Sequence, residues 1–285
     1  MLTALAAALV LASSPPQAAS VRVPVANLWA APGAGRLPLD PHVWPTAAIT
    51  YAQRLALVGH LPTQALYGEQ VLVLGKRGGW THIAVPDQPS PLDRRGYPGW
   101  VRSWQLGPPL PPRPQSVTVT APSARLANGT EVSFGTRLPL LARGGSTVQV
   151  ETPSGASTLP AAAVAPPPAS LVATAKEFMG LHYLWGGLSA WGYDCSGLTW
   201  AVYRVHGITI PRDADAQAAA GTPVSMSALR PGDLIFYGVS FVHHVAMYAG
   251  GGKMIEAPNS ASEVRLVPVR TFDLVGAKRF AAKYA

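Results

Sequence analysis

Cysteine and charge are scarce in this sequence. Cys195 is the only cysteine among 285 residues, and 13% of the residues are charged. A lone cysteine cannot form an internal disulfide, so the fold must be stabilised by packing. The hydrophobic content of 48% excludes a disordered chain, and the length allows two or three small domains. Two interpretations of Cys195 remain, a buried apolar residue or a nucleophile.

A hydrophobic run long enough to span a bilayer is also missing. The first residues, MLTALAAALVLASSPPQAAS, contain a short apolar run followed by small residues of the kind that precede signal-peptidase cleavage. They predict an export signal over residues 1–20, although the first basic residue, Arg22, follows the run instead of preceding it. We therefore expect a protein of the periplasm, cell wall or extracellular space, without stable membrane insertion.

Positive charge is in excess, with a formal net charge of +8. This charge indicates either a polyanionic partner or simply a basic, self-repelling surface. The basic residues are scattered and are not interleaved with aromatics as in single-strand binding platforms, so a nucleic acid partner is not expected. For an exported protein, the anionic polymers of a bacterial wall fit better. Nothing in the sequence requires more than a monomer or predicts a cofactor.

The mature chain is divided by two proline-rich stretches, GPPLPPRPQ and PAAAVAPPPAS. They predict domains over residues 21–107, 108–165 and 166–285. In the first, EQVLVLGKRGGWTHIAV (69–85) has two strand-like runs joined by a Gly-Gly turn, and weaker alternations such as STVQVETP mark the second. We expect a multidomain chain with one or two small β-barrels before a third domain of another class.

The third domain combines helices and strands. SLVATAKEFMG (170–180) has apolar residues at helical spacing between a serine N-cap and a glycine. A second helix should run from Cys195 to His206 and end at Gly207. Strand-like runs follow: DLIFYG, HHVAMYAG, GKMIEAP, VRLVPV and LVGAKRF. Helices that precede an antiparallel sheet indicate an α+β domain.

The surroundings of the cysteine favour reactivity. Asp194 can cap the helix that begins at Cys195, which places the thiol at a helix N-terminus. There the helix dipole favours the thiolate, the form that attacks carbonyl groups. Ser196 and Gly197 are small, so a substrate can approach closely.

A thiolate nucleophile needs a proton shuttle, for which His243 and His244 are the candidates. A hairpin centred on Gly250 places His244 opposite Glu256 and sends His243 to the other face of the sheet. Glu256 could then accept a hydrogen bond from one nitrogen of His244 and orient the other toward Cys195. A register shifted by one residue would give the role to His243.

Other roles can be assigned to some of these residues. Side chains of metal-ligand type occur in this domain: His182, His243, His244 and Glu256. Their spacing matches neither a helical HExxH nor a paired-cysteine site, so no metal is expected. Tyr183, in LHYLWGG, could place its phenol near the attacked carbonyl, or it could be a packing residue.

Taken together, these motifs resemble the NlpC-type cell-wall cysteine endopeptidases, which have a compact papain-like fold. The similarity runs from about Leu171 to Tyr284 and rests on YLWGG, DCSGL, IPRDADAQ, LRPGDLIFY, HHVAMYAGGGKMIEAP and VRLVPV, in this order. It implies that Cys195 is the nucleophile, His244 the base and Glu256 the residue that orients the imidazole. Histidine, asparagine or glutamine is more common in the family at that last position, and glutamate is a variant.

The N-terminal part resembles bacterial SH3-like domains through TQALYGEQVLVL, GGWTHIAVPDQP and RRGYPGWV, and residues 115–163 fit a second such domain loosely. In relatives of this build, the first SH3-like domain narrows the cleft and helps to recognise a free N-terminal L-alanine. Carboxylates and hydroxyls are suitable partners for that ammonium group. The resemblance implies that it is bound by Glu69, Tyr97, Asp194 and Ser196. The alternative is that Glu69 merely ends a strand and Tyr97 is a packing residue.

The activity implied by the resemblance is that of an exported cysteine endopeptidase, similar to the γ-D-glutamyl-L-diamino acid endopeptidases. It would hydrolyse the γ-D-glutamyl–diamino acid bond in peptidoglycan stem peptides or muropeptides that carry a free N-terminal L-alanine. Cys195 would attack the carbonyl, its backbone N–H and Tyr183 would stabilise the oxyanion, and His244 would protonate the leaving amine. Two alternatives stay open: hydrolysis of intact cross-linked peptidoglycan, and a wall-binding protein without catalytic activity.

Overall fold

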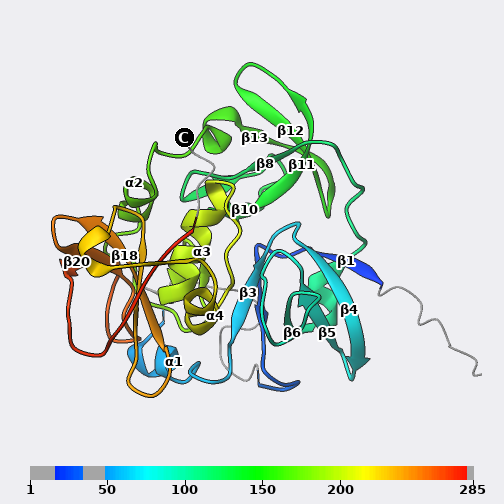
Figure 1. Ribbon diagram of the computed structural model, residues 1–285. Helices are drawn as coiled ribbons and strands as arrows, with labels where there is room; N and C mark the ends of the chain where they lie inside the picture. The colour runs from blue at the N-terminus through cyan, green and yellow to red at the C-terminus, as the bar shows by residue number, and fades with distance from the viewer. Residues whose placement is uncertain (1–16, 35–48, 281–285) are drawn as a thin grey trace, which may run out of the picture.

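The N-terminal domain is a small β-barrel, drawn in blue to teal in Figure 1. The computed structural model describes residues 17–34 and 49–280. The elements of this domain are β1 (Ala18–Val21), β2 (Val25–Leu28), α1 (Tyr51–Leu55), β3 (Thr63–Leu66), β4 (Gln70–Arg77), β5 (Trp80–Val85), β6 (Tyr97–Arg102) and β7 (Leu106–Gly107). An antiparallel sheet has the order β6-β5-β4-β1-β7, and β2 pairs separately with β3.

The β4-β5 hairpin shows how the local sequence builds this barrel. Gly78 and Gly79 have φ angles of +52° and +81°, which residues with a side chain rarely adopt. They form the predicted turn, because Arg77 and Trp80 on either side of them are paired. The interior is filled by buried aliphatic side chains, among them Val21, Val71, Ile83 and Val101.

The structure moves one predicted domain boundary. Ala18, Ala19 and Ser20 belong to β1 and pair with β4, so the first domain begins inside the stretch predicted as an export signal. Residues 1–16 of that stretch lie outside the described residues. The predicted start of the domain at Val21 therefore falls inside β1, three residues after that strand begins.

The second domain is built from short strands and one short 3₁₀ helix, Ala161–Val164, drawn in green in Figure 1. Its strands are β8 (Ser116–Thr118), β9 (Ser123–Arg125), β10 (Glu131–Ser133), β11 (Arg137–Arg143), β12 (Thr147–Thr152) and β13 (Gly155–Pro160). They form a sheet of order β13-β12-β11-β8 and a β10-β9 pair. Their buried side chains surround a separate core that includes Val117, Leu138, Val150 and Leu159. Two β-domains thus precede the third, as predicted.

The third domain packs helices against an antiparallel sheet, which confirms the predicted α+β class. The helices are α2 (Leu171–Lys176), α3 (Cys195–Val205) and α4 (Ala214–Ala219). The strands are β14 (Leu188–Ser189), β15 (Gly192–Tyr193), β16 (Thr222–Val224), β17 (Leu234–Tyr237), β18 (His244–Gly250), β19 (Lys253–Glu256), β20 (Arg265–Pro268) and β21 (Leu274–Arg279). The main sheet has the order β16-β21-β17-β18-β19-β20.

The ends of the predicted helices are set by their caps. The Ser170 hydroxyl accepts a hydrogen bond from the backbone N–H of Ala173 at the start of α2, and Gly207, with φ +75°, follows the end of α3. The capping side chain and the left-handed glycine satisfy backbone groups that a helix leaves unpaired. The short elements α4 and β16 were not predicted.

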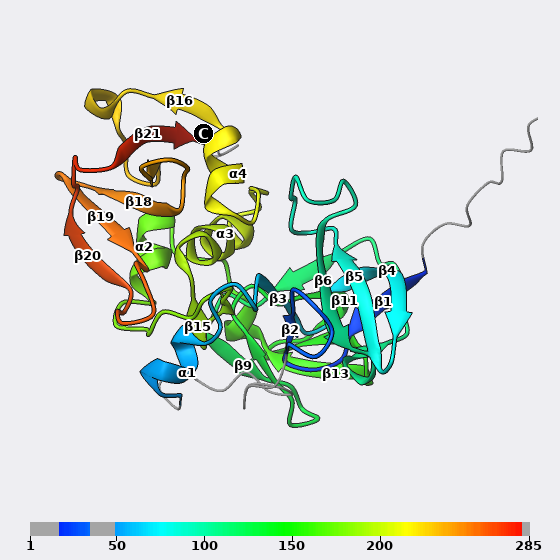
Figure 2. The ribbon, with the colours of Figure 1, turned by 90° about the horizontal axis from the view of Figure 1, so that it is seen from below.

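Both barrels contact the third domain. Figures 1 and 2 show α1, which belongs to the first domain in sequence, lying against the third domain. There Arg54 donates a hydrogen bond to the carbonyl oxygen of Ser260 at 3.1 Å. A shared apolar cluster joins the same two domains: Trp29, Ile49, Leu57, Leu61, Trp80 and Leu184. Among the residues that the structure describes, no helix is long and apolar enough to cross a membrane.

Candidate active site

Cys195 is the first residue of α3. Asp194 is the N-cap, and its Oδ1 accepts a hydrogen bond from the backbone N–H of Gly197 at 2.6 Å, as predicted. Cys195 is 8% exposed, so the thiol is sheltered but opens to a cleft. The first backbone N–H groups of a helix have no partner within it. The N–H of Cys195 is therefore placed to bind an oxyanion that forms on a substrate carbonyl.

The contact between His244 and Glu256 is present, but the predicted register is wrong. The hairpin pairs Met247 with Ile255 and Tyr248 with Met254, so His244 lies two residues away from the position opposite Glu256. The turn is centred one residue later than assumed, and a bulge interrupts the pairing before it. A two-residue offset preserves the face of the sheet, so His244 Nε2 and Glu256 Oε2 lie 2.8 Å apart on a diagonal.

Hydrogen bonding raises the pKa of His244 above the usual value for a histidine. Burial alone would disfavour the imidazolium, but hydrogen bonds with Cys195 and Glu256 outweigh burial and raise the pKa of His244 to about 9. Because Nε2 faces Glu256, Nδ1 is the nitrogen left for the thiol. An imidazolium beside a cysteine favours the thiolate. His243, in contrast, lines the cleft and contacts Phe241 with its ring edge-on.

Glu256 is held by two arginines that the sequence analysis did not single out. Arg265, on β20, donates from Nε and Nη2 to Oε1 at 3.0 and 2.8 Å, and Arg270 donates from Nη1 to Oε2 at 3.0 Å. Burial of the carboxylate would raise its pKa, but His244 and the two guanidinium groups lower the pKa of Glu256 to about 2. The cross-strand pairing of Glu256 with Arg265 is a signal that a correct register would have supplied.

Cys195 lies between two adjoining hollows of one cleft. Both are lined by the same central residues: Tyr183, Trp185, Cys195, Phe241 and His243. The first, with a volume of about 330 Å³, is named the acidic pocket and is also lined by Tyr97, Asp194, Ser196, Asp213 and Asp215. The second, of about 690 Å³, is named the basic pocket and is also lined by Arg265, Arg270, Phe272, Asn259 and Tyr51. Opposite charges therefore flank the nucleophile.

The acidic pocket joins residues of two domains. Tyr97, from β6 of the first barrel, forms a hydrogen bond with Asp213 of the third domain. Burial and the nearby Asp213 raise the pKa of Tyr97 well above its usual range, so the phenol stays protonated. Burial also raises the pKa of Asp213, and Arg212 offsets this only in part. Tyr97, Asp194 and Ser196 thus lie together as predicted, and Asp213 was missed although it lies in the quoted motif IPRDADAQ.

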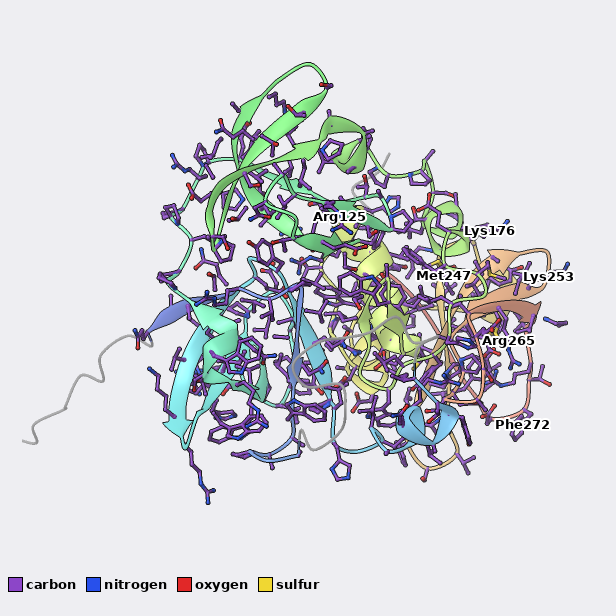
Figure 3. The ribbon with its side chains drawn as sticks, turned by 180° about the vertical axis from the view of Figure 1, so that it is seen from behind. Arg125, Lys176, Met247, Lys253, Arg265 and Phe272 are labelled. Carbon is purple, nitrogen blue, oxygen red and sulfur yellow. The ribbon has the colours of Figure 1, made fainter. Side chains whose placement is uncertain are left out.

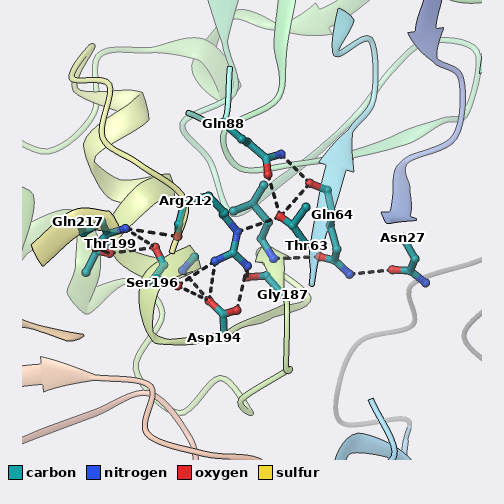
Figure 4. A network of polar contacts seen from close by, with 12 residues as sticks. Asn27, Thr63, Gln64, Gln88, Gly187, Asp194, Ser196, Thr199, Arg212 and Gln217 are labelled. Atoms are coloured by element: carbon teal, nitrogen blue, oxygen red, sulfur yellow. Dashed lines mark hydrogen bonds and ion pairs between the residues drawn. The ribbon is translucent and has the colours of Figure 1, made fainter. Parts of the chain in front are cut away.

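Arg212 organises the residues around the nucleophile, as Figure 4 shows. Its side chain is 0% exposed, and Nη2 donates to Asp194 Oδ2 at 2.8 Å. Nη1 donates to the Ser196 hydroxyl at 2.9 Å, and Nε donates to Thr63 of the first barrel at 2.8 Å. The network continues through three buried amides of the first barrel: Gln88, Gln64 and Asn27. The N-cap of α3 is therefore tied to the first barrel by a chain of hydrogen bonds.

The structure places Glu69 elsewhere, which corrects its predicted role in ammonium binding. Its Oε1 accepts from Arg204 Nη1 at 2.9 Å, and its Oε2 accepts from the backbone N–H of Leu66 at 2.9 Å. Glu69 lines a different cavity, at the junction of the three domains, and neither pocket beside Cys195. The carboxylate closes the turn that follows β3 and pairs with α3, so both its oxygens are engaged.

Tyr183 lies in the cleft beside Cys195. It lines both pockets with Cys195, is 5% exposed, and has a pKa raised by burial and by Cys195 well above its usual range. The phenol therefore remains a hydrogen-bond donor beside the nucleophile. Within residues 17–34 and 49–280, no three histidine, cysteine or acidic side chains are grouped so that they could hold a metal ion.

The comparisons with known proteins agree with this geometry. The NlpC/P60 family matches residues 180–274, and a domain described as the YKFC SH3b2 domain matches residues 119–165. A Bacillus subtilis protein named gamma-D-glutamyl-L-lysine dipeptidyl-peptidase is 37% identical over 85% of this chain and 90% of its own length. The chain belongs to the NlpC/P60 family.

A Bacillus cereus sequence and a Bacillus cereus crystal structure support the placement of the whole chain. A Bacillus cereus protein of the same name is 36% identical over 92% of this chain and 90% of its own length. The crystal structure of an NlpC/P60 family protein from Bacillus cereus superposes with a TM-score of 0.83 at 36% identity, over 92% of this chain and 99% of that one. As a member of the NlpC/P60 family, the protein is a cysteine peptidase with SH3-like domains.

Proposed function

We propose that this protein is an exported cysteine endopeptidase that cleaves the γ-D-glutamyl–diamino acid bond of peptidoglycan peptides with a free N-terminal L-alanine. The observation that carries the proposal is the acidic pocket beside Cys195. Asp213 and Asp215 line it, whereas none of the described residues that line it is a lysine or an arginine. Such a pocket suits an ammonium group a short distance from the attacked carbonyl.

The chemistry follows from the order of the groups. The Cys195 thiolate attacks the γ-carbonyl of D-glutamate, and the negative charge on the carbonyl oxygen is stabilised by the Cys195 backbone N–H and the Tyr183 hydroxyl. The His244 imidazolium gives its proton to the leaving amine as the C–N bond breaks. His244, now neutral, takes one proton from the water that attacks the thioester carbonyl. The C–S bond then breaks, the acid product releases its remaining proton to solvent, and the thiolate and imidazolium are restored.

Recognition of the free amine is assigned to Tyr97 and Asp213, with Asp194 and Ser196 beside them. Asp194 is already paired with Arg212, so Asp213 supplies most of the negative charge, and the Tyr97 hydroxyl adds an acceptor. Acetylation of the alanine would remove the positive charge and add bulk beside Tyr97 of the first barrel, which lines the pocket. The relatives' name, gamma-D-glutamyl-L-lysine dipeptidyl-peptidase, agrees with this choice of bond.

The test is mass spectrometry of products from L-Ala-γ-D-Glu-diamino acid tripeptides with a free or an acetylated N-terminus. We expect the free peptide to be cut and the acetylated one to be cut at least about tenfold more slowly, since a lost charge-assisted contact costs this much. Cys195→Ala should abolish cleavage. Full turnover by Cys195→Ala would refute the mechanism, equal cleavage of both peptides would remove the amine recognition, and activity only on intact wall would replace the substrate.

A further inference from the structure

The basic pocket lies on the side of Cys195 away from the acidic pocket. Both pockets share the nucleophile, and the proposed function, on which this inference rests, places the L-alanine and D-glutamate in the acidic one. The scissile bond then crosses above Cys195. The diamino acid that leaves as the amine must therefore occupy the basic pocket.

Cations line this pocket, whereas the carboxylates that pair with them do not. Arg265 and Arg270 line the basic pocket, and none of its described lining residues is acidic. Their partners are buried behind them: the Glu256 side chain is 0% exposed and that of Asp273 is 8% exposed. A group in the pocket meets the guanidinium groups before it meets these carboxylates.

Arg265 is the more available of the two arginines. It uses one edge of its guanidinium, Nε and Nη2, for Glu256 Oε1, and its side chain is still 51% exposed. Arg270 is 31% exposed, because it lies over the Tyr237 ring at 3.9 Å and contacts Asp273 as well as Glu256. Figure 3 shows Arg265 and Phe272 on the same side of the third domain, away from the barrels.

We infer that Arg265, supported by Arg270, selects a leaving diamino acid whose side chain ends in a carboxylate. Guanidinium groups bind carboxylates through paired N–H donors. The side chain of lysine ends in an ammonium group, which two arginines repel. The side chain of meso-diaminopimelate ends in a carboxylate beside an ammonium group, so its end carries no net charge and offers a partner to Arg265. We therefore expect it to be preferred to lysine, the residue in the relatives' name. The pocket walls, which include Phe272 and Tyr51, suit the methylene groups between the two ends.

The experiment compares kcat/KM for three tripeptides of sequence L-Ala-γ-D-Glu-X. X is meso-diaminopimelate, the same residue with its side-chain carboxylate amidated, or L-lysine. For the wild-type protein we expect the acid to exceed the amide by roughly tenfold, since the contact is half exposed, and lysine to be no better than the amide. In Arg265→Gln the acid-to-amide ratio should fall toward one.

The ratio separates recognition from catalysis. Arg265→Gln also removes two donors to Glu256, so all three rates are expected to drop, but a general loss cancels in the ratio. Arg265→Lys keeps a charge and should retain part of the preference. Arg125→Gln, an exposed arginine of the second barrel, is the matched control and should change neither the rates nor the ratio.

The outcomes distinguish this inference from the proposed function. Equal kcat/KM for the acid and the amide with the wild-type protein overturns the inference alone, even if Arg265→Gln cannot be purified. An acid preference that survives unchanged in both Arg265→Gln and Arg270→Gln also overturns it. Failure to cleave any of the three peptides overturns the proposed function, and the inference falls with it.

Discussion

The charge balance around His244 is the property of single residues on which activity depends most. Glu256 shares its negative charge among one imidazolium and two guanidinium groups. Burial in such a cluster costs free energy that only full pairing offsets. A neutral orienting residue would accept one hydrogen bond from His244 without needing the arginines. The glutamate and the two arginines are therefore best understood as one unit.

Replacement of Glu256 by glutamine should move the alkaline limit of activity to lower pH. In the wild-type protein, kcat/KM should fall as the imidazolium loses its proton, with an apparent pKa near the value of about 9 for His244. Without the carboxylate, and with two arginines left nearby, the imidazolium is less favoured. The midpoint should drop by roughly 1 to 3 pH units. The measurement is a pH profile of kcat/KM.

A surface glutamate provides the control for this profile. Glu131→Gln, in the second barrel and far in sequence from the site, should leave the alkaline midpoint in place. A midpoint that does not move in Glu256→Gln would contradict the assignment of Glu256 as the residue that keeps His244 protonated.

The raised pKa of His244 also makes the stability of the fold depend on pH. The contribution of His244 to folding is complete below its ordinary pKa of 6.5 and is lost as pH rises through about 9.

The three residues proposed for catalysis could be singled out from the sequence because each carries a local signal. Cys195 follows an N-capping aspartate, and His244 and Glu256 lie on the two adjacent strands that flank a glycine turn. The face of the sheet on which a side chain lies depends only on whether the register offset is odd or even. An error of two residues therefore left His244 and Glu256 on the same face. Arg265 and Arg212 come from other elements and have no such signal. Glu69 was placed by resemblance alone, and tertiary pairing with Arg204 removes it from the cleft.

The element that positions the nucleophile is α3, and its start is packed too tightly to accept a side chain at Gly197. A Cβ there would collide with the carbonyl oxygen of Gly187. At an exposed helix position, Gly→Ala would stabilise by about 1 kcal/mol. At Gly197 we expect the opposite sign, a loss of about 1 to 3 kcal/mol in unfolding free energy, measured by denaturant titration. Activity should fall as well, because the first turn carries the oxyanion donor.

A glycine in open surroundings provides the control for Gly197→Ala. At Gly75 in β4, an added Cβ would meet no atom within 4 Å, and the position does not require a positive φ. Gly75→Ala should therefore be neutral or slightly stabilising. If Gly197→Ala were equally neutral, the close approach of α3 to the Gly187 loop would not matter for stability.

The N-cap of α3 also carries a buried charge. Asp194→Asn keeps a good N-cap but leaves the guanidinium of Arg212, which is 0% exposed, without its carboxylate. Removing one partner of a buried ion pair costs about 3 to 5 kcal/mol, and we expect a loss of this size in unfolding free energy. The double variant Asp194→Asn/Arg212→Met should recover part of it. A loss below about 1 kcal/mol, the size of a cap effect, would contradict the role of the pair.

The elements with strong terminal signals were the ones that could be predicted. Ser170, Asp194 and Gly207 mark helix ends, and the glycine pairs mark the hairpins. The elements α4 and β16 are short, and β16 contains a proline, so neither has a periodicity long enough to detect. The hairpin register could not be predicted, because the bulge beside Gly250 depends on how the turn packs.

At the scale of the whole molecule, the three domains meet at Arg204 of α3. Its Nη1 and Nη2 pair with Glu69 and Asp87 of the first barrel at 2.9 and 3.2 Å, and its Nε donates to the carbonyl oxygen of Gly135 in the second at 3.1 Å. The sequence could predict three domains from proline-rich stretches, but not this junction. Its residues are far apart in the chain, and the motifs that contain Glu69 and Asp87 do not indicate that they pair with Arg204.

The roles of the residues at the junction and in the cleft can be distinguished by comparing two variants. Glu69→Gln weakens the pairing of Arg204, which keeps Asp87, so we expect a loss of about 1 to 3 kcal/mol in unfolding free energy and a lower Tm. Glu69 does not line the acidic pocket, so the preference for a free over an acetylated N-terminal alanine should persist. Tyr97→Phe removes the hydroxyl that meets Asp213 inside that pocket and should reduce the preference by roughly tenfold. If Glu69→Gln reduced the preference as much as Tyr97→Phe and left Tm unchanged, Glu69 would act in recognition after all. If instead Glu69→Gln lowers Tm and keeps the preference, and Tyr97→Phe reduces the preference, the first barrel has two separable roles. Glu69 then holds the domains together and Tyr97 recognises the substrate.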